Sequence, residues 1–305
     1  MKKAVIDIGT NSIKFCLAES GKNDGTFSVL KDANDIAKLG EGLRETGLIG
    51  AEPLERNAQA VAGFAKEAKE AGADEVAVVG TMALRTAKNT AAFAARVKEL
   101  CGLDVRVVPG EEEAQLSYIA VMSGIPGAAE ANLVSFDTGG GSTEFVFGEA
   151  GEIKRKFSLN VGAIRFTEQY LSETPVAAEN LAKARAEIRR ELSEGGVTAG
   201  AEFLVGMGGN VTSMASVKHQ MKVYDANIIQ GSKMTLADVR AQIAEYAAKT
   251  LDERKRITGL QPKRADVILA GACIIEAAME LCGVDELTVS DRGLRHGLLY
   301  RLFKA

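Results

Sequence analysis

Residues 135–145 read SFDTGGGSTEF, and this stretch is the most informative one for the fold. The apolar run 133–136 predicts a buried strand, and residues 145–147 predict the strand that returns beside it. Three consecutive glycines allow the backbone between these strands to turn tightly and to expose its N–H groups. N–H groups exposed in a row can bind an anion, and Asp137 beside them can hold a metal ion or a water molecule. A hairpin turn without a ligand fits the same residues, and the local sequence does not separate the two interpretations.

The same pattern occurs near the start of the chain. Residues 7–15 (DIGTNSIKF) align without a gap on residues 137–145 (DTGGGSTEF). A strand, an aspartate, a glycine-containing polar turn and a second strand therefore occur twice. This internal repeat predicts two similar halves that face each other, and two matched turns support phosphate binding better than one.

Composition places limits on the class of protein. A chain of 305 residues is long enough for about two domains, and its apolar and charged fractions of 46% and 26% are ordinary for a soluble α/β protein. The formal net charge of −4 argues against general binding to nucleic acid or to anionic membranes. A polyanionic substrate would therefore have to meet a local basic patch.

The chain shows no sequence signal for export or for membrane insertion. Residues 1–3 (MKK) run directly into a strand that ends at Asp7, and the apolar stretch 267–282 is interrupted by Glu276 and Glu280. We therefore expect a cytoplasmic protein. The four cysteines lack CxxC spacing and are expected to be buried free thiols: Cys16, Cys101, Cys273 and Cys282.

Apolar periodicity predicts alternating strands and helices along the rest of the chain, which is typical of an α/β fold. The expected strands are residues 4–8, 13–18, 75–80, 105–108, 203–205 and 287–290. The expected helices are residues 53–72, 89–100, 161–171, 177–194, 235–249 and 265–281, with a further helix at the end. No linker separates the two halves, so we expect them to pack around one cleft.

Three further stretches carry candidate chemistry. Arg85 follows the carboxyl end of strand 75–80, where ligand groups gather in α/β sheets. A helix that opens at Pro109 carries Glu111, Glu112 and Glu113 in its first turn, where acidic residues also complement the helix dipole. Neighbouring helical residues point about 100° apart, so these glutamates cannot share one task. Residues 206–212 (GMGGNVT) join a strand to a helix and could cradle a phosphate, although helix starts need tight turns anyway.

Taken together, these motifs resemble the exopolyphosphatase / guanosine pentaphosphate phosphohydrolase family of the actin–sugar kinase–Hsp70 superfamily. The resemblance extends from Asp7 to Gly297 and fits the shorter, two-domain members of that family. It implies a duplicated ribonuclease-H-like α/β fold with the active site in the interdomain cleft. The expected domains are residues 1–121, with helix 293–305 packing back on them, and residues 122–292.

The resemblance also implies roles for individual residues. Phosphates would be clamped by the two hairpin turns and by the third glycine-rich turn: Gly9, Thr10, Asn11 and Ser12; Gly139, Gly140, Gly141 and Ser142; and Gly208 and Gly209. Arg85 would bind phosphate, and Glu113 would be the general base with Glu112 as its neighbour. Asp137 and Glu144, together with Asp7, would place Mg²⁺ and the attacking water, and Asp137 would also be part of the catalytic set.

Two positions depart from the family pattern. Asn210 stands where Thr is usual, and His296 stands where Glu is frequent. Neither change affects the hairpins or the predicted base, so they bear on substrate preference. Three basic clusters fit either a path for a long polyanion or, more simply, solvated helix faces: 254–256, 263–264 and Arg185 with Arg189 and Arg190.

These residues can support direct attack of water on a phosphoanhydride, which requires positioning, charge neutralisation and a proton acceptor. The expected substrate is inorganic polyphosphate or a guanosine phosphate such as pppGpp. Two alternatives remain open: an ATP-dependent phosphotransferase on the same fold, and a module that binds pppGpp or ppGpp without turnover. A homodimer is the default assembly.

Overall fold

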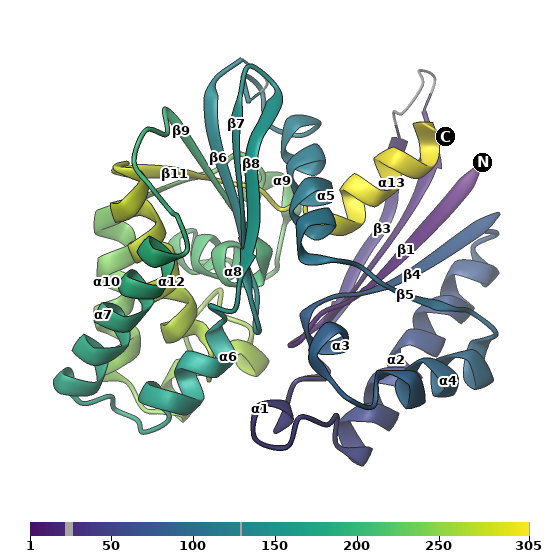
Figure 1. Cartoon of the computed structure of the whole chain (residues 1–305), viewed down its shortest axis with the longest axis horizontal. Helices are drawn as coiled ribbons and strands as arrows, with labels where there is room; N and C mark the ends of the chain where they lie inside the picture. Colours follow the sequence, from purple (N-terminus) through teal and green to yellow (C-terminus); the bar gives the residue numbers. More distant parts are fainter. Residues whose placement is uncertain (22–26, 129, 305) are drawn as a thin grey trace. The chain divides into compact units, whose positions relative to one another are not determined.

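The computed structural model describes residues 1–21, 27–128 and 130–304, and it divides into two compact units (Figure 1). Unit 1 comprises Met1–Ala120 and the residues from Leu294 onward, and unit 2 comprises Val121–Gly293. The polypeptide therefore leaves unit 1 after Ala120, forms the whole of unit 2 and then returns to unit 1.

The five strands of unit 1 form one sheet in the order β3-β2-β1-β4-β5. Neighbouring strands β1, β2 and β3 are antiparallel, whereas β4 is parallel to β1 and β5 is parallel to β4. Their bounds are β1 Lys2–Ile8, β2 Ile13–Ser20, β3 Phe27–Asp35, β4 Glu75–Gly80 and β5 Val105–Val107.

Both faces of the unit 1 sheet are buried, because successive side chains of β1 and β2 point to opposite faces. On one face Ile6 and Phe15 belong to a core that includes α2 (Ala51–Glu70) and α4 (Thr90–Cys101). On the other face Val5 and Cys16 belong to a core with α5 (Gly110–Met122) and α13 (Leu294–Lys304). Two short helices complete the unit: α1 (Leu43–Thr46) and α3 (Met82–Thr86).

Unit 2 contains a six-stranded sheet in the order β10-β11-β9-β6-β7-β8. The strand bounds are β6 Asn132–Thr138, β7 Thr143–Glu149, β8 Glu152–Leu159, β9 Phe203–Met207, β10 Lys233–Thr235 and β11 Glu286–Val289. The helices are α6 Ala163–Phe166, α7 Ala178–Glu194, α8 Gly208–Lys218, α9 Ala226–Ile229, α10 Leu236–Ala248, α11 Leu251–Arg254 and α12 Ile268–Cys282. A π-helix (η1, Thr167–Leu171) continues α6, and a 3-10 turn (η2, Pro262–Arg264) precedes α12.

The most apolar helix of unit 2 lies at the centre of its core. Almost every residue of α12 is buried, since α7, α8 and α10 all pack against it. A helix enclosed in this way is apolar all round, which accounts for the stretch at 267–282. Among the described residues, no helix has the length and apolar character needed to cross a membrane.

The two sheets repeat one topology. The run β8-β7-β6-β9-β11 of unit 2 has the same order and the same strand directions as β3-β2-β1-β4-β5 of unit 1. The register of the first hairpin is also the same, because Asp7 lies opposite Lys14 as Asp137 lies opposite Glu144. The predicted duplicated α/β fold is therefore confirmed.

Three strands were absent from the sequence prediction. Of these, β3 and β8 are edge strands with few buried side chains, and β10 is only three residues long. Edge strands bury little apolar surface and therefore lack the apolar alternation that reveals a strand. All expected strands and helices are present, with ends that differ by a few residues.

Candidate active site

In unit 1, the turn between β1 and β2 has its carbonyl groups fixed from one side. The N–H of Gly9 donates to the carbonyl of Ser12 at 3.0 Å and closes the turn. The carbonyls of Thr10 and Asn11 accept from the N–H groups of Gly40 (2.9 Å) and Lys38 (3.0 Å). Because C=O and N–H point in opposite directions across a trans peptide, the N–H groups of Asn11 and Ser12 point away from the 38–40 segment.

In unit 2, the turn between β6 and β7 is fixed in the same way by a helix. The N–H of Gly139 donates to the carbonyl of Ser142 at 2.9 Å. The carbonyls of Gly139 and Gly140 accept from Ala163 (3.1 Å) and Ile164 (2.9 Å) in the first turn of α6. The N–H groups of Gly140 and Gly141 therefore point away from α6 and can donate to an anion on that side.

Opposite residues of an antiparallel pair lie on the same face of a sheet. Asp137 and Glu144 are such a pair, and both are buried, with 8% and 3% of their surface exposed. Glu144 accepts a hydrogen bond from the hydroxyl of Ser158 at 2.7 Å. Two buried carboxylates on one face of a sheet are costly unless nearby groups or a cation compensate their charge.

The start of α8 lies close to the Asp137 carboxylate. A Cβ on Gly208 would lie 2.2 Å from Asp137 Oδ1, so only glycine allows this close approach of the backbone. Carboxylate oxygens are preferred ligands of Mg²⁺, which takes one or two of them and keeps several waters. Asp137 and Glu144 therefore fit Mg²⁺. Asp7 fits it less well, because its cross-strand partner on the same face is the cationic Lys14.

The predicted base and the predicted phosphate-binding arginine of unit 1 contact each other. Arg85 Nη1 in α3 donates to Glu113 Oε2 at 2.6 Å and to the carbonyl of Val108 at 2.8 Å. Both side chains are mostly enclosed, with 20% of Arg85 and 12% of Glu113 exposed. A charge-assisted hydrogen bond of this length fixes the orientation of the Glu113 carboxylate.

Glu112 has different partners, although it is the next residue of α5. Its carboxylate accepts from Arg106 at 3.0 Å and from Arg301 of α13 at 2.9 Å. These ion pairs connect α5 to β5 and to α13 within unit 1. Glu112 thus has partners that differ from those of Glu113, and its part in catalysis stays a prediction.

The third glycine-rich turn begins α8. Gly208 has a φ of +88°, a left-handed conformation that glycine adopts without strain. A Cβ on Gly209 would lie 2.3 Å from Arg264 Nη1, so the Arg264 guanidinium lies directly against the start of the helix. Asn210 donates to the carbonyl of Thr138 at 3.0 Å and packs against Gly271, which is a structural reason for this departure from the family pattern.

Two of the basic clusters each contain one buried arginine, Arg254 or Arg264, whereas Lys255, Arg256 and Lys263 are exposed as the simpler interpretation of the sequence expects. Arg264 is only 5% exposed, and burial lowers its pKa to about 10, which still leaves it charged at neutral pH. Arg254 is fully buried and donates to the carbonyl of Tyr246 at 2.6 Å. By contrast, Arg185, Arg189 and Arg190 do form ion pairs on a helix surface.

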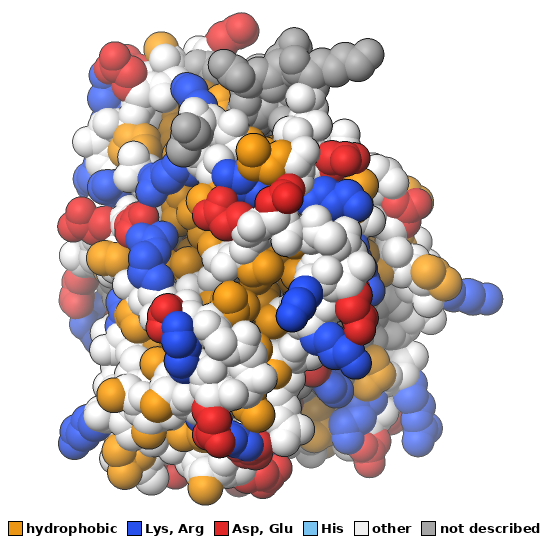
Figure 2. Space-filling view, turned by 90° about the vertical axis from the view of Figure 1, so that its right-hand side faces the viewer, with side chains coloured by type: hydrophobic (Ala, Val, Ile, Leu, Met, Phe, Trp, Pro, Cys, Tyr) orange, Lys and Arg blue, Asp and Glu red, His pale blue; other side chains and the backbone are white. Residues whose placement is uncertain are grey.

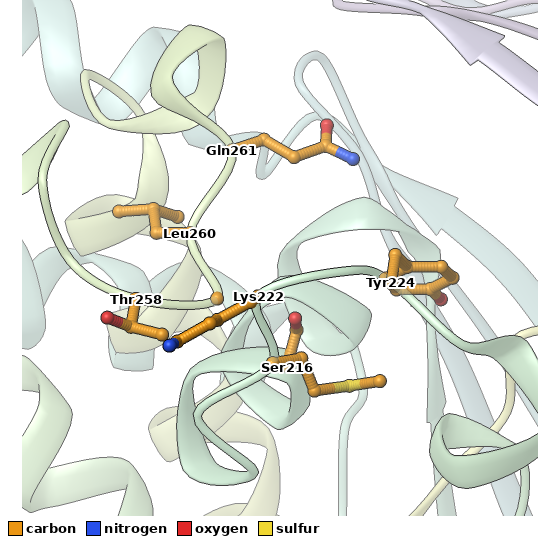
Figure 3. A pocket seen from close by; sticks show the side chains of 8 residues that line it. Ser216, Lys222, Tyr224, Thr258, Leu260 and Gln261 are labelled. Carbon is orange, nitrogen blue, oxygen red and sulfur yellow. The ribbon is translucent and has the colours of Figure 1, made fainter.

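A pocket of about 320 Å³ lies in unit 2 near the C-terminal end of α8, the end opposite the glycine-rich turn (Figure 3). Ser216 of α8 lines it, together with two segments, 221–224 and 258–261. The second segment leads directly to Arg264, and the Tyr224 hydroxyl is close enough to Arg264 to influence its pKa. The pocket therefore combines an aromatic ring, an amide and a lysine, from Tyr224, Gln261 and Lys222.

The surface of the molecule is of mixed charge where Figure 2 shows it. Among the described side chains on that face, Lys and Arg are interspersed with Asp and Glu. The basic residues that stand out, such as Lys14 and Arg264, are therefore distinguished by their own neighbours.

Comparison with known proteins identifies the family. The model of the Ppx/GppA phosphatase family matches residues 18–305. The chain belongs to this family. It is 32% identical to Exopolyphosphatase 2 of Mycobacterium tuberculosis over 98% of both chains. Its structure is similar to that of the Aquifex aeolicus PPX-GPPA enzyme, with a TM-score of 0.83, 32% identity and 99% of each chain covered.

Other relatives of this Ppx/GppA chain are longer. It is 28% identical to the guanosine-5'-triphosphate,3'-diphosphate pyrophosphatase of Vibrio vulnificus, where 98% of the chain matches 59% of the relative. It is 30% identical to a bifunctional 3-dehydroquinate synthase/phosphatase of Fusobacterium nucleatum, and it spans 45% of that protein. The chain thus spans about half the length of these curated relatives.

Sequence reasoning missed two candidate residues that the structure reveals. Lys14 could have been recognised from the repeat, because it aligns with Glu144 and reverses the charge of that position. Arg264 gave no usable signal, since a buried arginine and a solvated one are identical in sequence. Only its contact with Gly209 distinguishes it.

Proposed function

We propose that this chain hydrolyses the terminal phosphoanhydride of inorganic polyphosphate and also converts pppGpp to ppGpp. The observation that carries the proposal is the pair of matched hairpins, each of which directs backbone N–H groups away from the segment that fixes its carbonyls. Membership of the Ppx/GppA phosphatase family and the names of its relatives support the same reaction class.

In this proposal the attacking water loses its proton to Glu113. The hydrogen bond from Arg85 holds the Glu113 carboxylate in one orientation, and the remaining guanidinium donors of Arg85 are suited to phosphoryl oxygens. A positioned general base contributes about 10²–10⁴-fold to such a reaction. No covalent enzyme intermediate is required.

Charge on the phosphates is compensated by several groups of the chain. The N–H groups of both hairpins bind phosphoryl oxygens, and Lys14 and Arg264 add positive charge beside the turn of unit 1 and beside Gly209. Asp137 and Glu144 would hold Mg²⁺, which when bound neutralises phosphoryl oxygens. Magnesium dependence, a cytoplasmic location and a homodimer stay predictions.

The pocket at the C-terminal end of α8 favours a nucleotide among the substrates. Its volume of about 320 Å³ is in the range of small-molecule sites. Tyr224 could stack on a base and Gln261 could hydrogen-bond its edge, while Arg264 binds a phosphate of the same molecule. We therefore expect Tyr224→Ala and Gln261→Ala to raise KM for pppGpp and to leave KM for polyphosphate unchanged.

A single assay of phosphate release tests the reaction class. Purified protein with Mg²⁺ is compared on short polyphosphate, long polyphosphate, pppGpp and ATP. We expect phosphate release from polyphosphate and pppGpp, and Glu113→Gln should lower kcat by about 10²–10⁴-fold. Glu111→Gln is the matched control, because this exposed glutamate of the same turn should leave kcat unchanged.

The outcomes separate the alternatives. Full activity of Glu113→Gln would refute its role as base. Product formation that requires ATP, without phosphate release from polyphosphate, would indicate a phosphotransferase. Tight binding of pppGpp without hydrolysis would indicate a sensor module.

A further inference from the structure

A cluster of potential metal ligands lies in unit 1 among residues that the proposed hydrolysis does not use. It consists of Cys16 from β2, Asp32 from β3 and His296 from α13. One ligand atom from each residue lies within 4.8 Å of the other two. The three residues come from separate parts of the sequence, so no short sequence motif contains them.

The topology of unit 1 brings these side chains together. Cys16 and Asp32 are directly opposite each other in the β2–β3 ladder, so they project from the same face of the sheet. Helix α13 packs on this face, with Leu294 and Leu298 in the same core as Cys16. This packing brings His296 Nε2 to 3.0 Å from Asp32 Oδ2.

The donor set suits zinc better than magnesium. A thiolate, an imidazole and a carboxylate are the three ligand types that Zn²⁺ takes in proteins, whereas Mg²⁺ prefers oxygen alone. Bonds of about 2.0–2.3 Å in a tetrahedron place neighbouring ligand atoms about 3.3–3.6 Å apart. The observed separations are close enough that small side-chain adjustments would admit the ion, with a fourth position left for water.

The surroundings supply a supporting contact and a route of entry. Arg295 Nε donates to Asp32 Oδ1 at 2.9 Å, and its Nη2 donates to Oδ2 at 2.8 Å. Such contacts orient a ligating carboxylate, although the positive charge of the arginine lowers the affinity for a cation. Cys16 and His296 are buried, whereas the Asp32 side chain is 25% exposed, so an ion would enter past Asp32.

We propose that Cys16, Asp32 and His296 form a three-ligand site for Zn²⁺ that fastens α13 to strands β2 and β3. The ion would connect residues 16 and 32 to residue 296, which lie at opposite ends of the sequence. It would therefore stabilise unit 1, because an ion that binds only the folded state raises stability. The same three residues without an ion form a hydrogen-bonded ion pair, and this is the alternative that the experiment must distinguish.

The test measures zinc binding by the full chain. Protein stripped with a chelator is titrated with Zn²⁺ in competition with a colorimetric indicator, in the presence of excess Mg²⁺. We expect about one zinc per chain, and a Tm that rises when zinc is added. Cys16→Ala and His296→Gln should each lose the bound zinc and the rise in Tm.

Two matched variants control for the chemistry of the substitutions. Cys273→Ala removes a buried thiol in unit 2, and His219→Gln removes an exposed imidazole; both should retain the zinc. If the ligand variants do not fold, Co²⁺ added to the wild-type chain supplies an independent measurement, because a cysteine ligand gives a thiolate-to-cobalt charge-transfer band. The absence of zinc binding, retention of zinc by the ligand variants, or the absence of that band would overturn the proposal.

Discussion

The hairpins of the two units share one backbone design but differ in the charge of one residue. In both, an aspartate is the penultimate residue of the first strand, a glycine N–H closes the turn onto a serine carbonyl, and the turn carbonyls are held from one side. The residue opposite the aspartate is Lys14 in unit 1 and Glu144 in unit 2. The two units therefore share the backbone geometry of the turn and differ in the charge at one cross-strand position.

The elements that support the two turns also differ. An irregular segment, residues 38–40, binds the carbonyls of the first turn, whereas the start of α6 binds those of the second. A Cβ on Gly40 would meet only the Thr10 side chain closely, but a Cβ on Gly162 would lie 2.3–2.6 Å from backbone atoms of Gly140 and Gly141. The second turn is therefore packed backbone against backbone.

Among the differences between the two hairpins, Glu144 should have the largest effect on activity. Glu144→Gln removes one of the two carboxylates proposed to hold Mg²⁺, and we expect phosphate release to fall by about 10–100-fold at a fixed Mg²⁺ concentration. The loss should be partly recovered at higher Mg²⁺. Ser158→Ala, which removes only the hydrogen bond to Glu144, should have a smaller effect in the same direction. Unchanged Mg²⁺ dependence of Glu144→Gln would break the comparison.

The positive charge of Lys14 should act on substrate binding. Lys14→Gln removes a cation beside the first turn, and we expect KM for polyphosphate to rise about tenfold with little change in kcat, which corresponds to about 1.4 kcal/mol. Salt screens exposed charges, so the wild-type KM should also rise with ionic strength more steeply than that of the variant. Steady-state kinetics at two salt concentrations measure both. An equal fall in kcat would show instead that Lys14 acts in the transition state.

The different packing around the two turns should appear as a difference in the free energy of unfolding of glycine variants. Gly162→Ala forces a methyl group into the backbone of the second turn, and we expect it to lower the free energy of unfolding by about 1–3 kcal/mol. Gly40→Ala should cost less, because the Thr10 side chain can rotate away. Urea denaturation of the two variants compares them directly. Equal costs would mean that the two turns are equally tolerant.

The smallest effect concerns the helix ends of the two units. In unit 2 a capping box joins Thr235 to Asp238, whereas α1, α2, α3 and α4 of unit 1 have no side-chain cap. Burial acts to raise the pKa of Asp238, but hydrogen bonds from Lys218 and Thr235 outweigh it and lower that pKa. The stability this carboxylate contributes is therefore present above about pH 4 and is lost as the pH falls through its folded-state pKa.

Asp238→Asn measures this contribution. The aspartate is partly exposed, so we expect a cost of at most about 1 kcal/mol at pH 7, and the difference from wild type should shrink in acid. Urea unfolding at pH 7 and pH 3 gives the two differences. A difference that stays constant with pH would show that the cap acts without its charge.

The internal repeat predicted two similar halves, and the resemblance to the exopolyphosphatase / guanosine pentaphosphate phosphohydrolase family implied the duplicated α/β fold. The buried elements were also predictable, since burial on both faces of β1 or all round α12 leaves a run of mainly apolar residues. Strands β3 and β8 were not, because an exposed edge leaves the choice of side chains almost free.

The sequence indicated those candidate residues that belong to a repeated motif, such as Asp137 and Gly139. The candidate site was not predictable where tertiary contacts distinguish the residues. Glu112 and Glu113 are neighbours of the same type, and only their partners, Arg301 and Arg85, distinguish the two carboxylates. Their roles in catalysis stay predictions.

The return of the chain to unit 1 has a consequence for synthesis. Unit 2 is continuous in sequence, so it can fold as soon as Gly293 has left the ribosome. One face of the unit 1 sheet, in contrast, is covered by α13, and Val5 and Cys16 stay exposed until the residues from Leu294 onward have been made. The unit that is translated first is therefore completed last, and a chaperone that shields apolar strands would act on the first 120 residues rather than on unit 2.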